Sequence, residues 1–375
     1  MELKVSVSSL KKYLYLIMMI WYLFAKFISF TSNESLRNNI LSLSNIAILG
    51  FITIFTIVDI VQSNKITINQ IVVFLFLIIE LVYSIIFSGF SIDYILILFL
   101  AVNYLFSYKD KKIIKNILDI KIIFVILAVI LSHLGILNDI QNVKSDGIGH
   151  SYGFIHANSL AMFFLAIVID ITILSKRNLK NSIFLFIIVF LQYKITLSRT
   201  SLLISLSALV VFLGKPYLTK KHLKESYKYL SIIGIWILSI LLPYIYNGEN
   251  VLLSKLSDLL SGRLYLGNYY IHHYPLSWFP QVVNRLQYSR FWDYIEFYND
   301  NFYLDFLLKN GVLLSLLLAI LILFLLKDIK LSVFHGILLL GCFLFLFIEN
   351  QGINPFLMTP FIFEFIAENN KGELL

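Results

Sequence analysis

Side chains that could do acid–base chemistry gather in one stretch, from Asn247 to Asn301. It holds the paired histidines His272 and His273, and Asp300 lies at its end. An imidazole or a partly desolvated carboxylate can take a proton from a hydroxyl group. We therefore expect Asp300, His272 or His273 to be a general base, although Asp300 would equally serve as the cap of the helix that follows.

Three cations fit the recognition of a phosphate. Arg199, in KITLSRTSLL, stands where one apolar run ends and the next begins, and Lys194 lies about one helical turn earlier. Arg263 stands in the long polar stretch. A guanidinium offers a planar fork that matches phosphate oxygens, and a lysine adds a point charge. The alternatives are a lysine that snorkels, an arginine at a loop end, and an arginine that holds the stretch to lipid headgroups.

A third group of polar residues precedes an apolar run in DGIGHSYGFIHANSLAMF. His150, Gly153, His156 and Asn158 stand just before or at the start of the expected helix, whose N-cap we expect to be Asn158 or Ser159. A helix N-terminus favours anions because its first amide groups have no partner within the helix. These residues are predicted to shape an anion or hydroxyl site, unless each histidine only forms local hydrogen bonds.

The elements that must position these residues are membrane helices. The chain has 375 residues, of which 59% are hydrophobic and 14% charged, and its mean hydropathy is +0.84. Its apolar runs have the length that a helix needs to cross a hydrocarbon layer of about 30 Å. We expect an all-α integral membrane protein, a single polytopic domain over residues 1–375 with a large extracytoplasmic loop over residues 247–302. Twelve spans are expected, at 13–30, 41–61, 66–88, 92–107, 117–137, 157–174, 182–197, 201–213, 229–246, 303–326, 332–348 and 354–367.

The distribution of Lys and Arg predicts the orientation of these spans. The net charge is +8, and the basic residues fall mainly in alternate short connectors, as the positive-inside rule requires. Orientation alone explains this charge, so we expect no nucleic-acid partner. Both termini are predicted to be cytoplasmic. Three segments should then meet on the outer face: 138–156, Lys194 to Thr200, and 247–302.

The large loop is expected to contain two amphipathic helices at the membrane surface. Apolar residues recur at helical spacing twice in this loop. The two sets are Leu252, Leu253, Leu256, Leu259 and Leu260, and then Phe291, Trp292, Ile295 and Tyr298. Some of its aromatic residues would anchor the loop at headgroup level, and others would offer flat faces to sugar rings: Tyr269, Tyr270, Tyr274 and Trp278.

Several mechanisms have no motif in this chain. A Gly-rich Lys-Ser/Thr phosphate loop, a His-Glu-x-x-His helix and an Asp-x-Asp pair are all missing, and Cys342 is the single cysteine. An ATP-driven pump and a metal-dependent nucleotide-sugar enzyme are therefore not expected. We predict no metal and no cofactor.

At these residues the chain resembles the bacterial O-antigen and capsular polysaccharide polymerase family and the related O-antigen ligases. The number of spans and the late outer loop match the family's architecture. The matching motif residues are Gly153, Phe154, His156 and Asn158; Ser198, Arg199 and Thr200; and Asp300, Asn301, Tyr303, Leu304 and Gly311. Ala157 replaces the family's proline after the histidine. The ligases carry an Arg-x-x-x-Leu motif, which Arg199 and Leu203 satisfy, and a His before a Gly, where this chain has Asp300 before Gly311. The missing histidine favours polymerase.

The resemblance implies an integral-membrane glycosyltransferase in the bacterial plasma membrane. Its donor and its acceptor would be undecaprenyl-pyrophosphate-linked oligosaccharide units, joined on the outer face, with a flippase and a chain-length regulator as possible partner proteins. In this scheme Arg199 and Arg263 hold the pyrophosphate with Lys194 in support, while His156, Asn158 and Asn301 shape the site. Asp300, His272 or His273 activates the acceptor hydroxyl.

Two other functions stay open. A ligase would transfer finished glycan to another acceptor. A flippase or transporter of lipid-linked oligosaccharide would use charges inside the membrane, for which Glu80 is the best residue, but the chain shows no internal repeat of the kind transporters have.

Overall fold

The computed structural model describes residues 17, 20, 21, 23–25, 27–35, 112–144, 147–284, 286–290, 293–297, 299–326 and 330–350. The described residues fall into two compact units. Unit 1 contains those up to Leu218, and unit 2 contains those from Thr219 onward. Each unit has its own helices and is described by itself.

Unit 1 is a group of packed helices with one small hairpin. Its labelled elements are α5 (Lys112–His133), β1 (Asn142–Lys144), β2 (Gly147–Gly149), α6 (Ala157–Leu174), α7 (Leu179–Thr196), α8 (Arg199–Leu213) and α9 (Lys215–Leu218). The two strands pair antiparallel, with Asn142 opposite Gly149.

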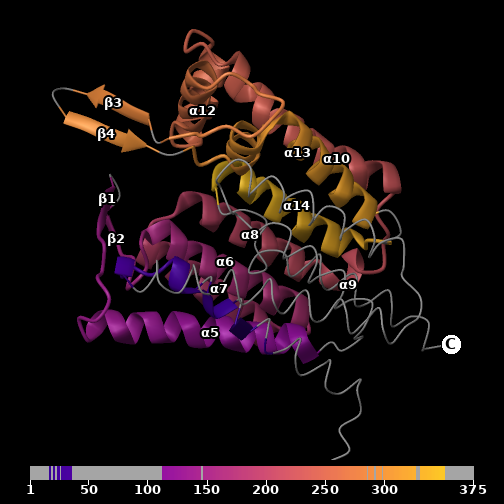
Figure 1. Ribbon diagram of the computed structural model, residues 1–375. Helices are drawn as coiled ribbons and strands as arrows, with labels where there is room; N and C mark the ends of the chain where they lie inside the picture. Colours follow the sequence, from indigo (N-terminus) through magenta and orange to yellow (C-terminus); the bar gives the residue numbers. More distant parts are fainter. Residues whose placement is uncertain are drawn as a thin grey trace, which may run out of the picture. The chain divides into compact units, whose positions relative to one another are not determined.

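Helix α6 is the centre of unit 1, and α5, α7 and α8 pack around it (Figure 1). Its residues from Leu160 to Phe163 are fully buried. By contrast, α7 exposes Phe184, Phe186 and Phe190 on the surface of the unit. A helix in water rarely presents such an apolar face, whereas a helix in lipid has no reason to hide it.

Aromatic rings join the N-terminal part of unit 1 to α6. The rings of Phe27 and Phe124 stack with centroids 4.7 Å apart, and Phe154 lies 5.0 Å from Phe163. Phe27 also meets Phe154 edge to face. Because these rings come from α5, α6 and two further segments, they hold the loop before α6 against the helices.

A glutamine links α7 to both of its neighbours. The side-chain amide of Gln192 donates to the Ala161 carbonyl of α6, and its oxygen accepts from the Ser205 hydroxyl of α8 at 2.8 Å. Gln192 and Ser205 are fully buried. Hydrogen bonds of this kind hold helices together in lipid, where burial of apolar surface gives little driving force between helices.

An ion pair lies inside the apolar helices of unit 1. Lys121 of α5 and Asp170 of α6 approach to 2.6 Å between Nζ and Oδ2, and both side chains are fully buried. A lone charge at this depth would cost several kcal/mol, on the order of 2.5–3.5 kcal/mol even on lenient insertion scales. The pair therefore fixes α5 against α6.

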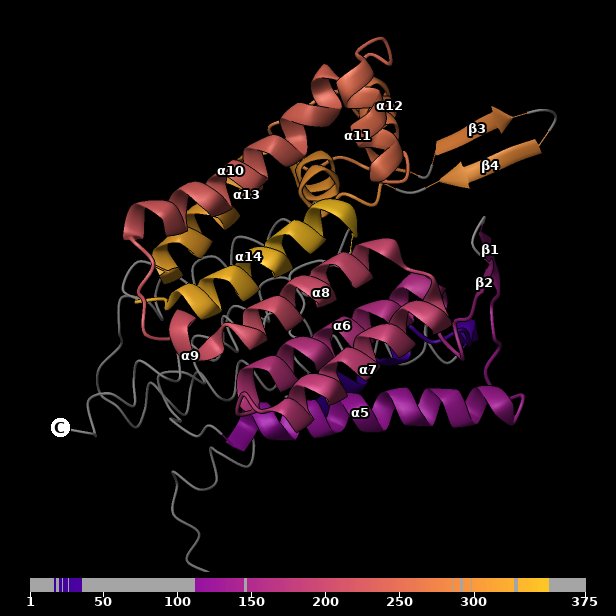
Figure 2. The same cartoon turned by 180° about the vertical axis from the view of Figure 1, so that it is seen from behind.

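Unit 2 is built around α10. Its elements are α10 (Glu225–Ile245), α11 (Val251–Leu259), α12 (Arg263–His273), β3 (Leu286–Arg290), β4 (Asp293–Phe297), α13 (Phe302–Leu326) and α14 (Val333–Ile348). Helix α10 contacts α12, α13 and α14. The antiparallel hairpin β3–β4 projects from the end that carries α11 and α12 (Figure 2).

In each unit a buried or half-buried lysine from another helix binds the last carbonyls of an apolar helix. The ammonium group of Lys215 donates to the carbonyls of Thr172, Ile173 and Ser175 at the end of α6. In unit 2, Lys228 donates to the Leu326 carbonyl at the end of α13. These carbonyls have no partner within the helix, and the negative end of the helix dipole favours a cation there.

Helix α13 is kinked at Gly311, where the backbone leaves the helical conformation with φ 79° and ψ 170°. The amide groups beyond the kink find partners in the segment before β3. Val312 donates to the Ser277 carbonyl at 2.9 Å, and Leu313 donates to the Trp278 carbonyl at 3.3 Å. Only glycine adopts this conformation readily, so a glycine at this position permits the kink.

Seven of the expected spans match helices of the structure: α5, α6, α7, α8, α10, α13 and α14. Five of these are long and apolar enough to cross a membrane, while α8 and α14 are shorter. The mostly helical chain with several such helices indicates a membrane protein. The expected spans 41–61, 66–88, 92–107 and 354–367, part of 13–30, and Glu80 lie outside the described residues.

The two helices expected in the large loop fared differently. At the first set the structure has a helix, α11, which begins where the Asn250 side chain accepts from the Leu252 and Leu253 amides. The second is wrong: residues 293–297 form strand β4, paired with β3. A run of about eight residues with aromatic and β-branched side chains fits a strand as well as a helix, and here the pairing partner decides. A second helix exists instead at α12.

The buried pair gives the first prediction. Asp170→Asn or Lys121→Met alone should lower the free energy of unfolding of the purified protein in detergent by about 3–5 kcal/mol, because one buried charge remains uncompensated. The measurement is thermal unfolding. The double variant Lys121→Met with Asp170→Leu should recover most of the loss. Lys115→Met, at an exposed position of α5, is the control and should change little. Equal effects of the single and double variants would contradict this account.

The kink gives the second prediction. A Cβ at Gly311 would meet the Phe279 carbonyl carbon and the Trp278 oxygen, both at 2.7 Å. Gly311→Ala should therefore destabilise the protein by about 1–3 kcal/mol or more in thermal unfolding. Gly234→Ala is the control, since a Cβ there meets nothing within 4 Å and alanine favours a helix. Equal stability of the two variants would refute the proposed role of Gly311.

Candidate functional site

The corner between α7 and α8 carries Lys194 and Arg199. Helix α7 ends at Thr196, Leu197 turns the chain with φ 49°, and α8 begins at Arg199. The His150 amide donates to the Ile195 carbonyl at 2.7 Å. This bond confirms that the segment 138–156 meets the corner, as we expected from the sequence.

Lys194 and Arg199 are both exposed at this corner. The ammonium nitrogen of Lys194 lies 5.8 Å from the centroid of the Phe190 ring, so its stem runs along an aromatic face. The structure thus leaves both cations accessible at the end of an apolar helix. This geometry fits a phosphate-binding corner and also fits a lysine and an arginine at a lipid headgroup.

His156 caps helix α6, and neither Asn158 nor Ser159 does. The Asn158 amide donates to Nδ1 of His156 at 3.0 Å, and His156 has the extended backbone of a cap. An unprotonated ring nitrogen accepts a hydrogen bond as an Asn oxygen does, which is why the cap falls two or three residues earlier than expected. Nε2 lies 2.8 Å from the side-chain amide of Asn142.

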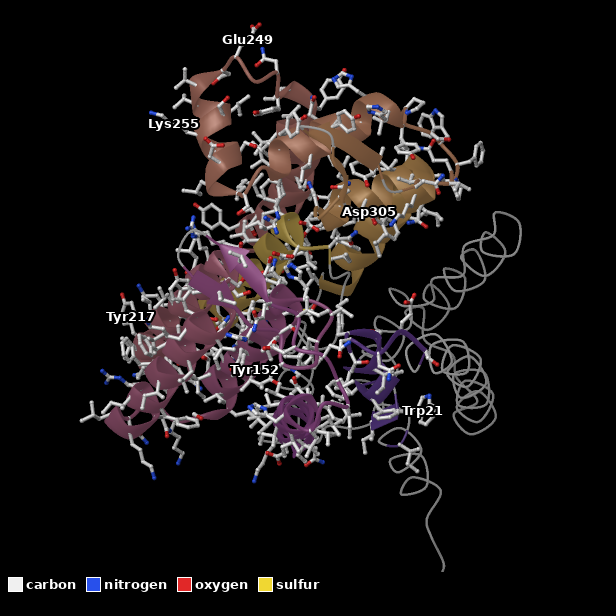
Figure 3. All side chains as sticks on the ribbon, turned by 90° about the vertical axis from the view of Figure 1, so that its left-hand side faces the viewer. Trp21, Tyr152, Tyr217, Glu249, Lys255 and Asp305 are labelled. Carbon is white, nitrogen blue, oxygen red and sulfur yellow. The ribbon has the colours of Figure 1, made fainter. Side chains whose placement is uncertain are left out.

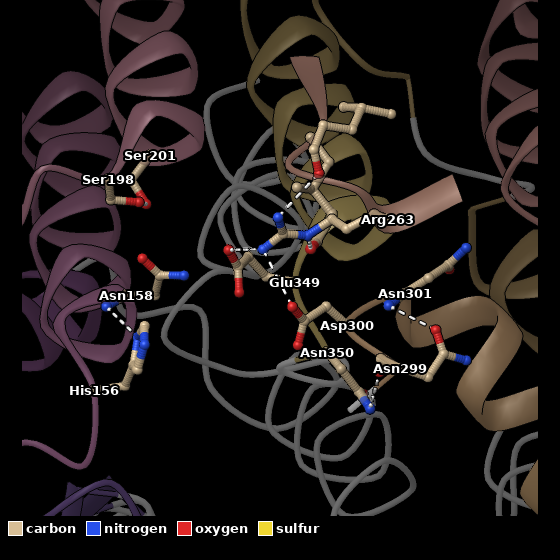
Figure 4. A network of polar contacts seen from close by, with 12 residues as sticks. His156, Asn158, Ser198, Ser201, Arg263, Asn299, Asp300, Asn301, Glu349 and Asn350 are labelled. Atoms are coloured by element: carbon tan, nitrogen blue, oxygen red, sulfur yellow. Dashed lines mark hydrogen bonds and ion pairs between the residues drawn. The ribbon is translucent and has the colours of Figure 1, made fainter. Parts of the chain in front are cut away.

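The predicted site residues of unit 1 lie at one end of its helices. In the close-up the Asn158 side chain lies between His156 and the pair Ser198–Ser201 (Figure 4). The two hydroxyl groups of that pair are 3.2 Å apart and buried. The structure therefore brings the α6 N-terminus to the same corner as Arg199.

Within unit 2, Arg263 is the centre of a polar cluster (Figure 4). Its guanidinium binds the Glu349 carboxylate at 2.7 Å and lies 3.4 Å from the carboxylate of Asp300. It also donates to the carbonyls of Ile348 and Leu260. Only 9% of the Arg263 side chain is exposed, so its charge is largely compensated inside the protein.

Asp300 is the more accessible carboxylate of this cluster, with 39% of its side chain exposed. Partial burial raises the pKa of its carboxyl group, the Arg263 guanidinium opposes that rise, and the negative charge of Asp305 adds to it; the net pKa is raised. A carboxylate with a raised pKa binds a proton more readily than usual, as a general base must.

Asn301, rather than Asp300, caps helix α13. The Leu304 amide donates to the Asn301 side-chain oxygen at 3.2 Å. Its side-chain nitrogen donates to the Ser239 carbonyl of α10 at 2.6 Å, and the residue is buried. Asn301 thus positions Asp300 by fixing the start of the helix. The Asp300 carboxylate contacts the Arg263 guanidinium instead of capping the helix.

The paired histidines end helix α12. Nδ1 of His273 lies 2.8 Å from the Tyr269 carbonyl, which can only accept, so Nδ1 carries a proton. The two rings lie 4.0 Å apart between centroids. The side chain of His272 is exposed and makes no hydrogen bond to the described part of the chain. Neither histidine contacts Arg263 or Asp300.

The aromatic residues expected to face sugar rings differ in exposure. Tyr270 is 2% exposed and belongs to a core cluster with Ile271, Leu304 and Leu308, so it is not available to a ligand. Tyr269 and Tyr274 are half-buried, and Trp278 is 65% exposed. Trp278 is therefore the best placed of the four.

The sequence did not point to three charged residues that matter here. Glu349 pairs with Arg263, and Lys121 pairs with Asp170. Each is a charge within or just after an apolar run, which is the signal that could have identified them. Their partners lie 49 or more residues away, so the pairing itself was not visible. Among the described residues, no group of three or more His, Cys, Asp or Glu side chains is placed to hold a metal ion.

Comparison of the chain with protein-family models, with curated proteins and with solved structures finds no match.

The raised pKa of Asp300 gives the third prediction. The folded state holds the Asp300 proton more tightly than the unfolded state, so its contribution to stability is present at low pH and is lost as the pH rises through the folded pKa. Asp300→Asn should therefore raise the melting temperature at neutral pH. The gain should shrink as the pH falls toward the ordinary carboxyl pKa of about 3.9.

Asp258→Asn is the control for this measurement. Asp258 is an exposed carboxylate at the end of α11, so the same exchange of a carboxyl group for an amide there shows what the substitution does outside the Arg263 cluster. A loss of stability in Asp300→Asn at neutral pH would contradict the prediction, because it would mean that attraction to Arg263 outweighs the cost of burial.

Proposed function

We propose that the protein is a polysaccharide polymerase of the bacterial plasma membrane. It joins oligosaccharide repeat units carried on undecaprenyl pyrophosphate at the outer face of the membrane. A pyrophosphate is a good leaving group, so the reaction needs positive charge where negative charge develops and a correctly placed hydroxyl. Neither a nucleotide nor a metal is required. The resemblance in the motif residues motivates this proposal.

The observation that carries the proposal is the exposed pair Lys194 and Arg199 at the α7–α8 corner. Both cations stand at the end of an apolar helix, where a lipid-linked pyrophosphate would lie. The α6 N-terminus and its cap His156 reach the same corner. In this scheme Arg199 binds the pyrophosphate and Lys194 supports it, while His156 and Asn158 shape the site.

Arg263 has a different part in the proposal from the one expected. Its donors already serve two carboxylates and two carbonyls. We therefore assign to Arg263 the role of holding Asp300 in place, and binding of the phosphate is not its sole role. Asp300, His272 and His273 remain the candidates of unit 2 for the proton acceptor, and Asn301 fixes the position of Asp300.

The fourth prediction concerns Arg199. Cells whose own copy of the gene is deleted should accumulate single repeat units on lipid, and the wild-type gene should restore long polymer. Arg199→Ala should reduce polymer on gels at least tenfold at equal protein level, and Arg199→Lys should restore part of it because a point charge replaces the fork. Arg177→Ala, between α6 and α7, is the control and should behave as wild type.

The deletion also separates the alternatives. Loss of a ligase would leave long chains on lipid, and loss of a flippase would leave single units on the inner face of the membrane. Full-length polymer in Arg199→Ala cells would show that this corner does not hold the pyrophosphate.

A further inference from the structure

Asp139 and His150 form a carboxylate–imidazole pair in the loop before α6. Oδ2 of Asp139 lies 2.6 Å from Nδ1 of His150, and their side chains are 25% and 31% exposed. An ionised carboxylate only accepts hydrogen bonds, so Nδ1 carries the proton. In the neutral form of the ring the lone pair is therefore on Nε2. Nε2 makes no hydrogen bond to any described residue.

The Asp139 carboxylate is itself held in position. The amides of Ser151 and Tyr152 both donate to its Oδ1 at 2.9 Å. Burial acts to raise the pKa of Asp139, but the hydrogen bonds from His150 and from these two amides outweigh it and lower the pKa below its ordinary value. Asp139 therefore stays ionised and keeps the imidazole in one tautomer.

The ring of His150 is also held from one face. Tyr152, labelled in Figure 3, stacks on it with centroids 5.3 Å apart and an interplanar angle of 12°. His133 of α5 stacks on the same tyrosine at 5.6 Å. Tyr152 has φ 39°, a backbone conformation that side chains other than glycine rarely adopt. The Tyr152 ring and the Tyr152 amide thus contact both members of the pair, the ring at His150 and the amide at Asp139.

The pair lies at the corner that carries the two exposed cations. The His150 amide donates to the Ile195 carbonyl, so the backbone of His150 lies beside the last turn of α7, at the residue between Lys194 and Thr196. Gly149 packs so closely there that a Cβ would lie 2.6 Å from the Thr196 carbonyl oxygen. The imidazole, Lys194 and Arg199 thus belong to one unit and one corner.

We propose that His150 is the proton acceptor for the attacking hydroxyl, with Asp139 as its positioning residue. The inference rests on the polymerase function proposed above. As the hydroxyl oxygen forms its bond to the anomeric carbon, the bond from that carbon to the pyrophosphate breaks. The electron pair leaves with the pyrophosphate, and the hydroxyl proton moves to Nε2 of His150. Asp139 stabilises the imidazolium that results.

This pair fits the step better than the histidines of unit 2 do. Nδ1 of His273 donates to a neutral carbonyl, whereas Nδ1 of His150 donates to a carboxylate. A carboxylate stabilises the positive ring that forms on proton transfer, and a carbonyl does so much less. The dyad also shares its unit with the cations that would hold the leaving group.

The test uses the purified full-length protein in detergent. The probe is the lipid-linked single repeat units extracted from the deletion cells, which supply the natural substrate. His150→Gln should lower the rate of chain growth at least a hundredfold, the lower end of what a general base contributes. In the wild type the rate should fall toward acidic pH as the imidazole takes up a proton, and this fall should be absent in His150→Gln.

Asp139→Asn tests the positioning role. Its side-chain oxygen can still accept from the Ser151 and Tyr152 amides, but its NH₂ would meet Nδ1 and force the other tautomer. The protein should keep its melting temperature within a few degrees and lose most of its rate. His133→Gln, the control, removes the outer ring of the stack without touching the dyad and should retain its rate.

The outcomes separate the two proposals. If the wild-type protein forms no chains from this extract, the polymerase proposal and the dyad fall together. If the wild type forms chains and both His150→Gln and Asp139→Asn do so within threefold of its rate, the dyad alone is refuted. A loss in Asp300→Asn or His273→Gln with His150→Gln unaffected would assign the proton to unit 2.

Discussion

Polar groups among apolar helices must find partners inside the protein, and this constraint organises both units. Lys121 and Asp170 neutralise each other between α5 and α6. Gln192 joins α7 to two helices. Lys215 and Lys228 donate to the last carbonyls of α6 and α13, which have no donor within their own helices. In lipid no water replaces these contacts, so each one fixes the position of a helix.

Under the same constraint, the burial of a charged group indicates whether it serves the structure or meets solvent. Where the chain satisfies a charge fully, as at Arg263, that charge serves the structure first. Where cations are exposed at the end of an apolar helix, as at Lys194 and Arg199, solvent reaches them. The Asp139–His150 pair lies at that second kind of place. Its carboxylate accepts from three donors, whereas its imidazole nitrogen Nε2 has no hydrogen-bond partner among the described residues.

Sequence reasoning succeeded where local pattern decides and stopped where distant partners decide. The span 157–174 coincides with α6 because a long apolar run is bounded by polar residues on both sides. The cap of that helix was misplaced because His156 accepts a hydrogen bond as an asparagine would. Residues 293–297 were misread because their helical spacing also suits a strand once β3 is available. The partnership of Arg263 with Glu349 joins residues 86 positions apart and has no local signal.

The account depends most directly on the products that the purified protein makes. Mass spectrometry of the extract from deletion cells, before and after incubation with wild-type protein and without nucleotide or added metal, measures them. The account predicts lipid-linked chains of two and more repeat units, with one lipid pyrophosphate released for each new bond. An extract that stays as single units, with no lipid pyrophosphate released, would contradict it.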